Sequence, residues 1–338
     1  MVEIKKLKDM IEKNYPLKVN RIYPEKDNNY KVETDQGYRQ LIPIRAKGKK
    51  IKFIESLITT LQKKGFKQIP ELYLTKENTS FVKDDYTNWI LFEWISGKTP
   101  DIDSKEVVEK ITRSLARLHQ MTVEIDGDGK GKKEWTKWPK KLMEERREFY
   151  QYLMKVEKAG DLSDFDQMMV EKSEMIKRRL DLSKKWVFSL GSQNLINSER
   201  DNLAVTYHKM KEKELLVDLY GEIYFNNPVK MRYDIRVEDL ITWIERLIKK
   251  VGKIHLIRDV VNWYSEERPL TRGEKEYLLS RLVYPKKVIK MVKRYHHDKK
   301  NWPEEGYVRK LSKALKRAEG EMKVYQELLK LFNELEEQ

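Results

Sequence analysis

The sequence predicts an α+β protein of two lobes, a small β-rich N-terminal lobe followed by a larger, mostly helical C-terminal lobe. The chain has 338 residues, which is long for one core and suits two lobes. Short runs with strand character lie before residue 95, whereas most later apolar residues recur at helical spacing. We therefore expect the N-lobe over residues 1–95 and the C-lobe over residues 96–338.

The N-lobe is predicted to hold a sheet and one main helix. A short charged helix opens the chain. DQG at residues 35–37 places Gly where a hairpin turn favours positive φ. Apolar residues at helical spacing predict a helix over residues 53–61, which Gly65 ends. The predicted strands cover residues 21–23, 30–34, 39–44, 72–74, 80–83 and 89–94.

The C-lobe is predicted to follow a short linker, ISGKTP at residues 95–100, whose Gly and Pro break both neighbouring elements. Asp103 and Glu106 are predicted to form a capping box at the start of the next helix. Further helices are expected over residues 138–185, with a break near Gly160, and over residues 240–335, with breaks near Pro269, Pro285 and Pro303.

The composition excludes several classes of protein. Without cysteine, the chain has no disulfide framework, zinc–thiolate site or cysteine nucleophile. It has neither a run of ~18 apolar residues for a membrane span nor the apolar region of a signal peptide, so we expect synthesis in the cytoplasm and no membrane partner. A formal net charge of +15 favours a solvated surface or an acidic partner. Basic residues cluster at 286–300 without a nucleic-acid-binding motif, so specific nucleic-acid binding is not expected.

The segment at residues 205–240 carries most of the functional information. It predicts a strand, a turn-like insert, a second strand (ELLVD), a turn at Gly221, a third strand (EIYF) followed by a polar pair, and a helix that begins near Leu240. This order resembles aminoglycoside-phosphotransferase-like kinases, whose segment carries H-x-D-x-x-x-x-N, a hydrophobic strand and D-F-[DE]. In this chain Lys209 stands at the catalytic Asp position, Glu214 at the Asn position and Asn227 at the metal-binding Asp position.

These replacements remove groups that phosphoryl transfer needs. An Asp orients the incoming hydroxyl, and an Asn and an Asp hold the magnesium ions that neutralise the phosphates. A lysine amine is protonated at neutral pH and cannot accept the proton of that hydroxyl. An Asn in place of the metal-binding Asp loses a full negative charge facing a divalent cation. We therefore expect no catalytic residues, no resident metal and no cofactor.

The resemblance places other kinase positions in the N-lobe. The lysine that pairs with nucleotide phosphates would sit near Ile42, which has no amine. Glu55 stands where the partner of that lysine would be, although a simple surface carboxylate is the alternative. The adenine-binding hinge would fall on Glu93, Trp94 and Ile95, and would use their backbone groups.

Some scaffold positions are retained. Asp239 matches the residue that ties down the catalytic loop through backbone hydrogen bonds, and it could also cap its own helix. His208 is offset by one from the family's loop histidine, which aligns with Tyr207. If the protein is an active, atypical kinase instead, it would use ATP and magnesium, and Glu214, Asp218 or Asp234 would have to hold the magnesium.

The chain resembles the spore coat CotS family of the aminoglycoside-phosphotransferase branch of kinase-like proteins. The resemblance rests on the order of several stretches, YKVETDQGYRQL, NWILFEWISGKTP, ITRSLARLHQMT, GEIYFNNPVKMRYDIRVEDL and VIKMVKRYHHDKKNW. It implies a two-lobed kinase-like fold and a place in the layers around bacterial endospores.

We therefore expect a pseudokinase, made in the mother cell and assembled into the spore coat, that binds other coat proteins or acidic polymers. The alternatives are an active atypical small-molecule or protein kinase and a basic polyanion-binding protein.

Overall fold

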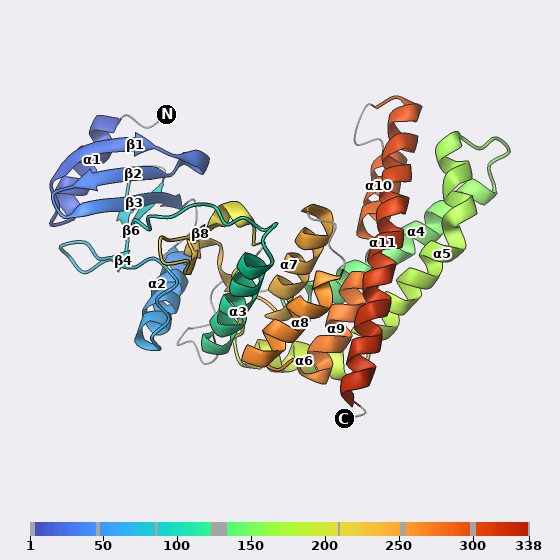
Figure 1. Ribbon diagram of the computed structural model, residues 1–338. Coiled ribbons are helices and arrows are strands. Elements are labelled where there is room, and N and C mark those ends of the chain that lie inside the picture. The colour runs from blue at the N-terminus through green and yellow to red at the C-terminus, as the bar shows by residue number, and fades with distance from the viewer. Residues whose placement is uncertain are drawn as a thin grey trace. The chain divides into compact units, whose positions relative to one another are not determined.

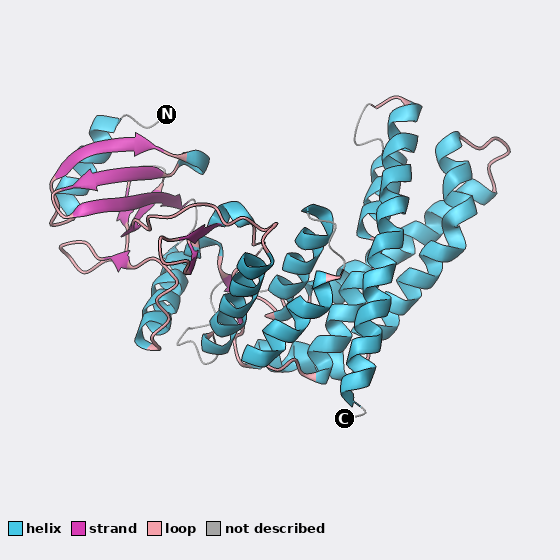
Figure 2. Cartoon of the chain, in the orientation of Figure 1, coloured by secondary structure: helices cyan, strands magenta, loops and turns pink. Residues whose placement is uncertain are grey.

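The computed structural model describes residues 4–44, 48–84, 87–122, 134–208, 210–250, 255–297 and 302–336. An antiparallel sheet forms in the N-terminal part and helices make up most of the remainder, so the predicted fold class is confirmed (Figures 1 and 2). Packing divides the chain into two compact units. The first holds Met1–Lys133 and Asn202–Asp239, and the second holds Glu134–Asp201 and Leu240–Gln338. The predicted lobe boundary after residue 95 divides the chain by position in the sequence, whereas these units divide it by packing. That boundary therefore stays a prediction.

The sheet of the first unit has the order β1-β2-β3-β6-β4, and β5 also pairs with β6. Leu41 of β3 lies opposite Leu91 of β6, and the two contribute to an apolar cluster with Leu7 and Ile11 of α1. A strand forms in each region where one was predicted. The elements are α1 (Ile4–Asn14), β1 (Val19–Pro24), β2 (Tyr30–Thr34), β3 (Gly37–Ile44), β4 (Leu72–Tyr73), β5 (Val82–Lys83) and β6 (Asn88–Glu93).

Two glycines at the boundaries of elements in this unit take left-handed backbone conformations. Gly37 begins β3 at φ +94° after the predicted hairpin turn, and Gly65 follows helix α2 (Gly48–Lys63) at φ +81°. Both positions favour Gly because a Cβ is strained at positive φ. The turn between β1 and β2 has no glycine, and Asp27 and Asn28 take φ values of 60° and 61° there.

The N-cap of helix α3 (Lys105–Met121) is Ser104, one residue after the predicted cap at Asp103. The capping box of Asp103 and Glu106 is wrong, because the hydroxyl of Ser104 accepts the hydrogen bond from the backbone N of Val107. Serine lies next in the chain and is equally suited to this position.

The segment at residues 205–240 forms the three predicted strands and the turn at Gly221 within the first unit. Strand β8 (Leu215–Val217) pairs with β9 (Ile223–Phe225), and Gly221 between them takes φ +79°. Outside this hairpin, β7 (Val205–Thr206) pairs with β10 (Arg232–Tyr233). Two 3₁₀ turns flank the hairpin, η2 (Glu212–Glu214) and η3 (Pro228–Lys230).

The second unit is helical in its described residues. The expected break near Gly160 lies between α4 (Lys137–Glu157) and α5 (Asp164–Val187). Arg179 of α5 is buried and donates from Nε to the carbonyl of Val283, 2.7 Å away, and from Nη1 to that of Ala318. One side chain thus joins three helices. The remaining helices are α6 (Leu190–Asp201), α7 (Val237–Lys250), α8 (Leu256–Glu267), α9 (Arg272–Val283), α10 (Lys286–His296) and α11 (Glu304–Glu336).

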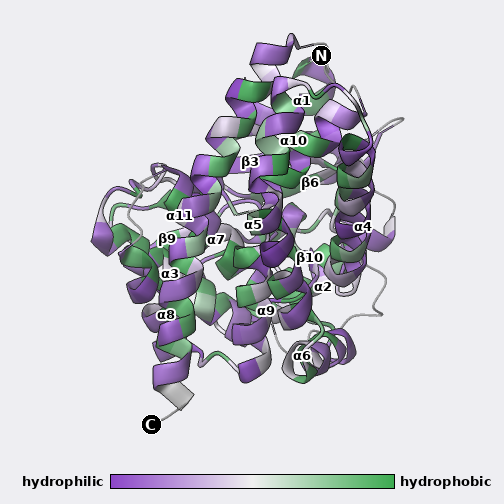
Figure 3. Ribbon diagram, turned by 90° about the vertical axis from the view of Figure 1, so that its right-hand side faces the viewer, coloured by the Kyte–Doolittle hydropathy of each residue, from purple (hydrophilic) through white to green (hydrophobic). Residues whose placement is uncertain are grey.

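Helices α10 and α11 of this unit carry both hydrophobic and hydrophilic residues. Hydrophobic and hydrophilic residues alternate along α10 and α11 (Figure 3), and the apolar residues of α10 are buried. Over the part of the chain that the structure describes, no helix combines the length and apolar character needed to cross a membrane.

Candidate functional site

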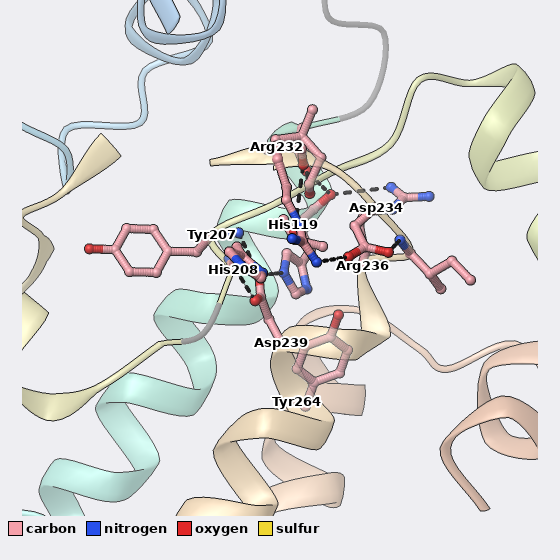
Figure 4. A network of polar contacts seen from close by, with 12 residues as sticks. His119, Tyr207, His208, Arg232, Asp234, Arg236, Asp239 and Tyr264 are labelled. Atoms are coloured by element: carbon pink, nitrogen blue, oxygen red, sulfur yellow. Dashed lines mark hydrogen bonds and ion pairs between the residues drawn. The ribbon is translucent and has the colours of Figure 1, made fainter. Parts of the chain in front are cut away.

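The carboxylate of Asp239 holds the loop that follows β7. Its Oδ2 accepts a hydrogen bond from the backbone N of Tyr207 at 2.5 Å, and its Oδ1 accepts one from that of His208 at 2.9 Å (Figure 4). His119 Nε2 of α3 lies 3.2 Å from the same Oδ2. Asp239 is 1% exposed, so these contacts replace hydration of the carboxylate.

Asp239 does not cap its own helix. Helix α7 begins at Val237, so Asp239 lies inside the first turn, where an acidic residue is favoured by the helix dipole. The capping alternative is therefore wrong. His208, whose backbone N donates to Asp239, has a left-handed backbone conformation with φ 64°.

Tyr207 fastens the same loop to the β8–β9 hairpin. The hydroxyl donates to the backbone carbonyl of Glu214 at 3.1 Å and accepts from the backbone N of Asn227 at 3.0 Å. Burial, and then the nearby Glu214 carboxylate, raise the pKa of Tyr207 well above its usual range, so the hydroxyl keeps its proton and stays a donor. Sequence reasoning assigned no such role to Tyr207. The available signal was an aromatic hydroxyl at the position of the family's loop histidine.

Glu214 and Asn227 lie at the two positions that hold metal in the kinase-like segment. The Glu214 side chain is buried and forms an ion pair with the ammonium of Lys230 from η3. Pro228 starts η3, and its fixed φ suits the first position of such a turn. Among the described residues, Glu214 Oε2 and Asn227 Oδ1 are buried and have no hydrogen-bond partner.

This arrangement does not fit Mg²⁺. Magnesium needs oxygen ligands in near-octahedral geometry, usually with one or two carboxylates. Here the one carboxylate at these positions already forms an ion pair with Lys230, so its charge is balanced without a metal ion. A search of the described ranges finds no group of three or more His, Asp or Glu side chains that could hold a metal.

The N-lobe positions are occupied by structural side chains. Ile42 is 4% exposed and lies opposite Ile90 in the sheet, so an apolar side chain stands where an amine would be. Glu55 of α2 accepts a hydrogen bond from the Ser80 hydroxyl at 2.8 Å. Glu55 is half-buried and hydrogen-bonded, unlike a simple surface carboxylate.

The hinge positions follow β6. Glu93 is the last residue of that strand, and its backbone N donates to the carbonyl of Glu71 at 2.9 Å. The ring of Trp94 lies 4.8 Å from Lys31 Nζ, and Ile95 is buried. The Trp94 ring thus packs against a residue of β2, and the Ile95 side chain is buried.

The turn between β1 and β2 carries negative charge. Asp27 lies in this turn, and its Oδ2 is 3.4 Å from Lys213 Nζ of η2. A carboxylate at this turn repels phosphate, whereas a glycine-rich turn would offer backbone N–H groups to it.

Three other predicted positions complete the segment. Lys209 lies outside the described residues. Asp218 accepts from the backbone N of Tyr220 and of Glu222, each at 2.9 Å, and so shapes the β8–β9 turn. Asp234 is buried and lies 2.6 Å from Arg232 Nη2.

The pKa of Asp234 departs furthest among the carboxyl groups of this segment. Burial, followed by the Glu238 carboxylate, raises the pKa of Asp234 to about 7, against the opposing effect of Arg232. Because both Asp218 and Asp234 are engaged in local contacts, neither is placed as a spare metal ligand.

Known proteins resemble this chain over nearly its whole length. A family model described as "Spore coat putative kinase YutH" matches residues 8–328. An aminoglycoside phosphotransferase from Alicyclobacillus acidocaldarius subsp. acidocaldarius DSM 446 is similar in structure, with a TM-score of 0.81 and 15% identity over 96% of this chain and 95% of that one. No curated protein matches the chain in sequence.

Two further solved structures are similar. Spectinomycin phosphotransferase APH(9)-Ia, in complex with ADP and spectinomycin, gives a TM-score of 0.62 at 16% identity over 96% of this chain and 99% of that one. The microcompartment-associated aminopropanol kinase gives 0.61 at 15% identity, over 97% and 98%. At these identities the likeness establishes a shared fold.

Proposed function

The chain belongs to the spore coat kinase family whose model it matches, "Spore coat putative kinase YutH", and we propose that it is a catalytically inactive member with a structural or interaction role in the bacterial endospore coat. The protein would be made in the mother cell and then assembled into the coat. It would use the kinase-like fold as a scaffold, without ATP or magnesium as cofactors.

The ion pair between Lys230 and Glu214 carries this proposal. It puts a fixed single positive charge beside the ligand positions of a divalent ion. An ammonium group can balance one carboxylate, but it cannot share oxygen ligands with two phosphates as magnesium does. A Mg²⁺ ion entering there would first have to displace Lys230 and leave its charge unpaired.

Several other replacements support the same conclusion. Ile42 offers no amine to the nucleotide phosphates, and Asp27 puts a carboxylate at the turn that would lie over them. Each tenfold loss of rate corresponds to about 1.4 kcal/mol of barrier, so the loss of several such groups removes several powers of ten.

One observation favours the alternative of an atypical kinase. Glu214 Oε2 is buried without a hydrogen-bond partner among the described residues, so one carboxylate oxygen is free to meet a ligand. In that case the protein would release phosphate from ATP with magnesium, and Glu214→Ala would abolish the release.

A melting experiment separates the two functions. We expect the Tm of the purified chain to be the same with millimolar ATP alone and with ATP plus Mg²⁺. The double variant Lys230→Ala/Asn227→Asp, which frees Glu214 and restores the second carboxylate, should gain a Mg²⁺-dependent shift. A Mg²⁺-dependent shift in the wild-type chain, lost in Glu214→Ala, would refute the inactive assignment.

The coat role is tested separately. A fluorescent fusion expressed during sporulation should accumulate around the forespore and be recovered in the coat extract of purified spores. The variant Glu214→Gln should localise equally well, because the scaffold function does not use the ion pair. Fluorescence that stays diffuse in the mother cell would contradict the coat role.

A further inference from the structure

Six basic side chains follow the seam between α10 and α11 in the second unit. Within each helix three of them are spaced i, i+3 and i+7, which places them along one face. We call this set the basic strip. It consists of Lys287, Lys290 and Arg294 on α10 and of Lys310, Lys313 and Arg317 on α11.

The two rows lie side by side and run in opposite directions. Helices α10 and α11 are consecutive and pack against each other (Figure 1). At one end, Arg294 Cζ lies 5.8 Å and Lys310 Nζ 4.4 Å from the ring centroid of Trp302. At the other end, after burial, Arg317 is the cation that contributes most to lowering the pKa of Lys287. A cation from each helix therefore acts at each end of the strip.

Most of the charge of the strip is not balanced. Lys287, Lys290 and Lys313 are exposed, and none forms an ion pair with an acid in the described ranges. Partial burial, and then the neighbouring cations led by Arg317, lower the pKa of Lys287. By contrast, Lys293 of the same helix lies 2.8 Å from a carboxylate oxygen of Glu148. The charges on this face repel one another, and an anionic partner would relieve that repulsion.

We propose that the basic strip docks an acidic α-helix of a partner protein, one with Asp or Glu at positions i, i+3 or i+4, and i+7. Each row extends over seven residues, about 10 Å. An α-helix laid along the seam has the same rise per residue as α10 and α11. Carboxylates at the same spacing on that helix therefore lie next to the cations of both rows. An extended chain places same-face side chains about 7 Å apart and falls out of step with the second and third cations.

The chemistry of the strip favours carboxylates over phosphate polymers. Its unpaired groups are lysines, which act as point charges. The guanidinium forks that bind phosphate in a bidentate way are already engaged, since Arg317 Nε lies 2.8 Å from Glu321 Oε1 and Arg294 faces Trp302. Trp302 also lies 5.2 Å from the ring of Tyr307, so it is not a free platform for a base.

The inference names a partner for the proposed structural role and rests on that role. It uses a different unit from the catalytic segment, so its test does not depend on whether a nucleotide binds. Nucleotide-dependent melting and peptide binding can therefore fail or succeed separately on the same preparation.

The experiment compares two labelled peptides of three heptads by fluorescence anisotropy at physiological salt. One carries all its Glu residues in a single helical stripe, and the other has the same composition with Glu spread around the helix. We expect the striped peptide to bind the full chain about tenfold more tightly than the spread peptide, because only it can meet both rows at once.

Two triple variants with the same change in net charge provide the control. Lys287→Glu/Lys290→Glu/Lys313→Glu should weaken binding of the striped peptide about tenfold or more. Lys140→Glu/Lys172→Glu/Lys184→Glu, at exposed lysines of α4 and α5, should leave it within about twofold. Circular dichroism checks that both variants are folded.

Three results would overturn the proposal. Equal affinity for the two peptides would show general charge attraction, as would equal losses in the two triple variants. Tighter binding of inorganic polyphosphate or of DNA than of the striped peptide, lost in the strip variant, would assign the surface to a phosphate polymer instead.

Discussion

The hydroxyl of Tyr207 lies 3.1 Å from the backbone carbonyl oxygen of Glu214 and donates a hydrogen bond to it from a fully buried position. The same hydroxyl accepts from the backbone N of Asn227. One phenol thereby joins the two residues that flank the β8–β9 hairpin to the loop held by Asp239. The backbone of the segment is held by these polar contacts, whereas the side chains at the ligand positions differ from those that a metal needs.

Removing this hydroxyl should destabilise the first unit. In Tyr207→Phe the N–H of Asn227 loses its partner, whereas the carbonyl of Glu214 keeps the hydrogen bond from the backbone N of Asn226. An unsatisfied buried polar group costs about 1–3 kcal/mol, so we expect the free energy of unfolding to fall by about that amount. Urea denaturation followed by far-UV circular dichroism measures the change.

The matched control for that variant is Tyr220→Phe. Tyr220 lies in the β8–β9 turn and is 89% exposed, so loss of its hydroxyl should change the free energy of unfolding by less than about 0.5 kcal/mol. Equal effects of the two substitutions would show that the hydroxyl of Tyr207 does not fasten the hairpin.

The hairpin and its turn could be predicted from sequence because their signals are local. Strand character on either side of Gly221 and the polar pair after Phe225 define the strand, turn and strand that the structure contains. Asp239 could be singled out because, in the EDL triplet before the helix, it matches the family position that ties down the catalytic loop. The same reasoning failed at Ser104, where two capping residues stand next to each other and either can serve.

The contacts that characterise the site could not be predicted in the same way. Lys230 and Glu214 are separated by a hairpin, and only the fold of η2 and η3 brings their side chains together. The basic strip likewise needs two helices. A cluster of lysines at 286–300 was visible in the sequence, but the opposing row around Lys313 belongs to α11 and has no local signal.

The stability of the protein should fall as pH rises through the range set by Asp234. Its folded pKa, about 7, is above the unfolded value of 3.8, so between these values the folded state holds more protons than the unfolded state. The contribution of Asp234 to the free energy of unfolding therefore decreases from about pH 4 to about pH 7, by about 1.4 kcal/mol for each unit of pKa difference. Urea denaturation at intervals of pH measures this slope.

Asp234→Asn should reduce the decrease, because an amide does not titrate. The exposed Asp161 provides the control, since Asp161→Asn leaves the buried group in place and should keep the wild-type slope. A slope that is the same in wild type and in Asp234→Asn would mean that another group controls the pH dependence.

Gly97→Ala should destabilise the linker by steric overlap. A Cβ at Gly97 would lie 2.7 Å from the carbonyl oxygen of Val217, and the backbones there are held together by hydrogen bonds between Lys98 and Val217 in both directions. Forcing such groups apart costs about 1–3 kcal/mol, which we expect as a lower free energy of unfolding in urea.

Gly48→Ala is the control for this substitution. Nothing lies within 4 Å of a Cβ at Gly48, which starts α2, and alanine reduces the entropy of the unfolded chain there. It should leave stability unchanged or raise it by up to about 1 kcal/mol. If Gly97→Ala behaves like Gly48→Ala, the linker does not approach β8 as closely as the structure indicates.

Lys287→Gln should raise stability while weakening partner binding. Partial burial, and then the neighbouring cations led by Arg317, lower the pKa of Lys287, so its charged form is less favourable in the folded state than in the unfolded state. Since the side chain is largely exposed, solvent screening limits the gain on neutralising it to a few tenths of a kcal/mol, about 0.2–0.5. Urea denaturation at low and high salt measures this gain, which should shrink as salt screens the repulsion.

Lys172→Gln, at an exposed lysine of α5 outside the strip, should show no gain at either salt concentration. A stability gain that Lys172→Gln matches, or that salt does not reduce, would show that the charges of the strip do not repel one another, and the reason for an anionic partner at this surface would be lost.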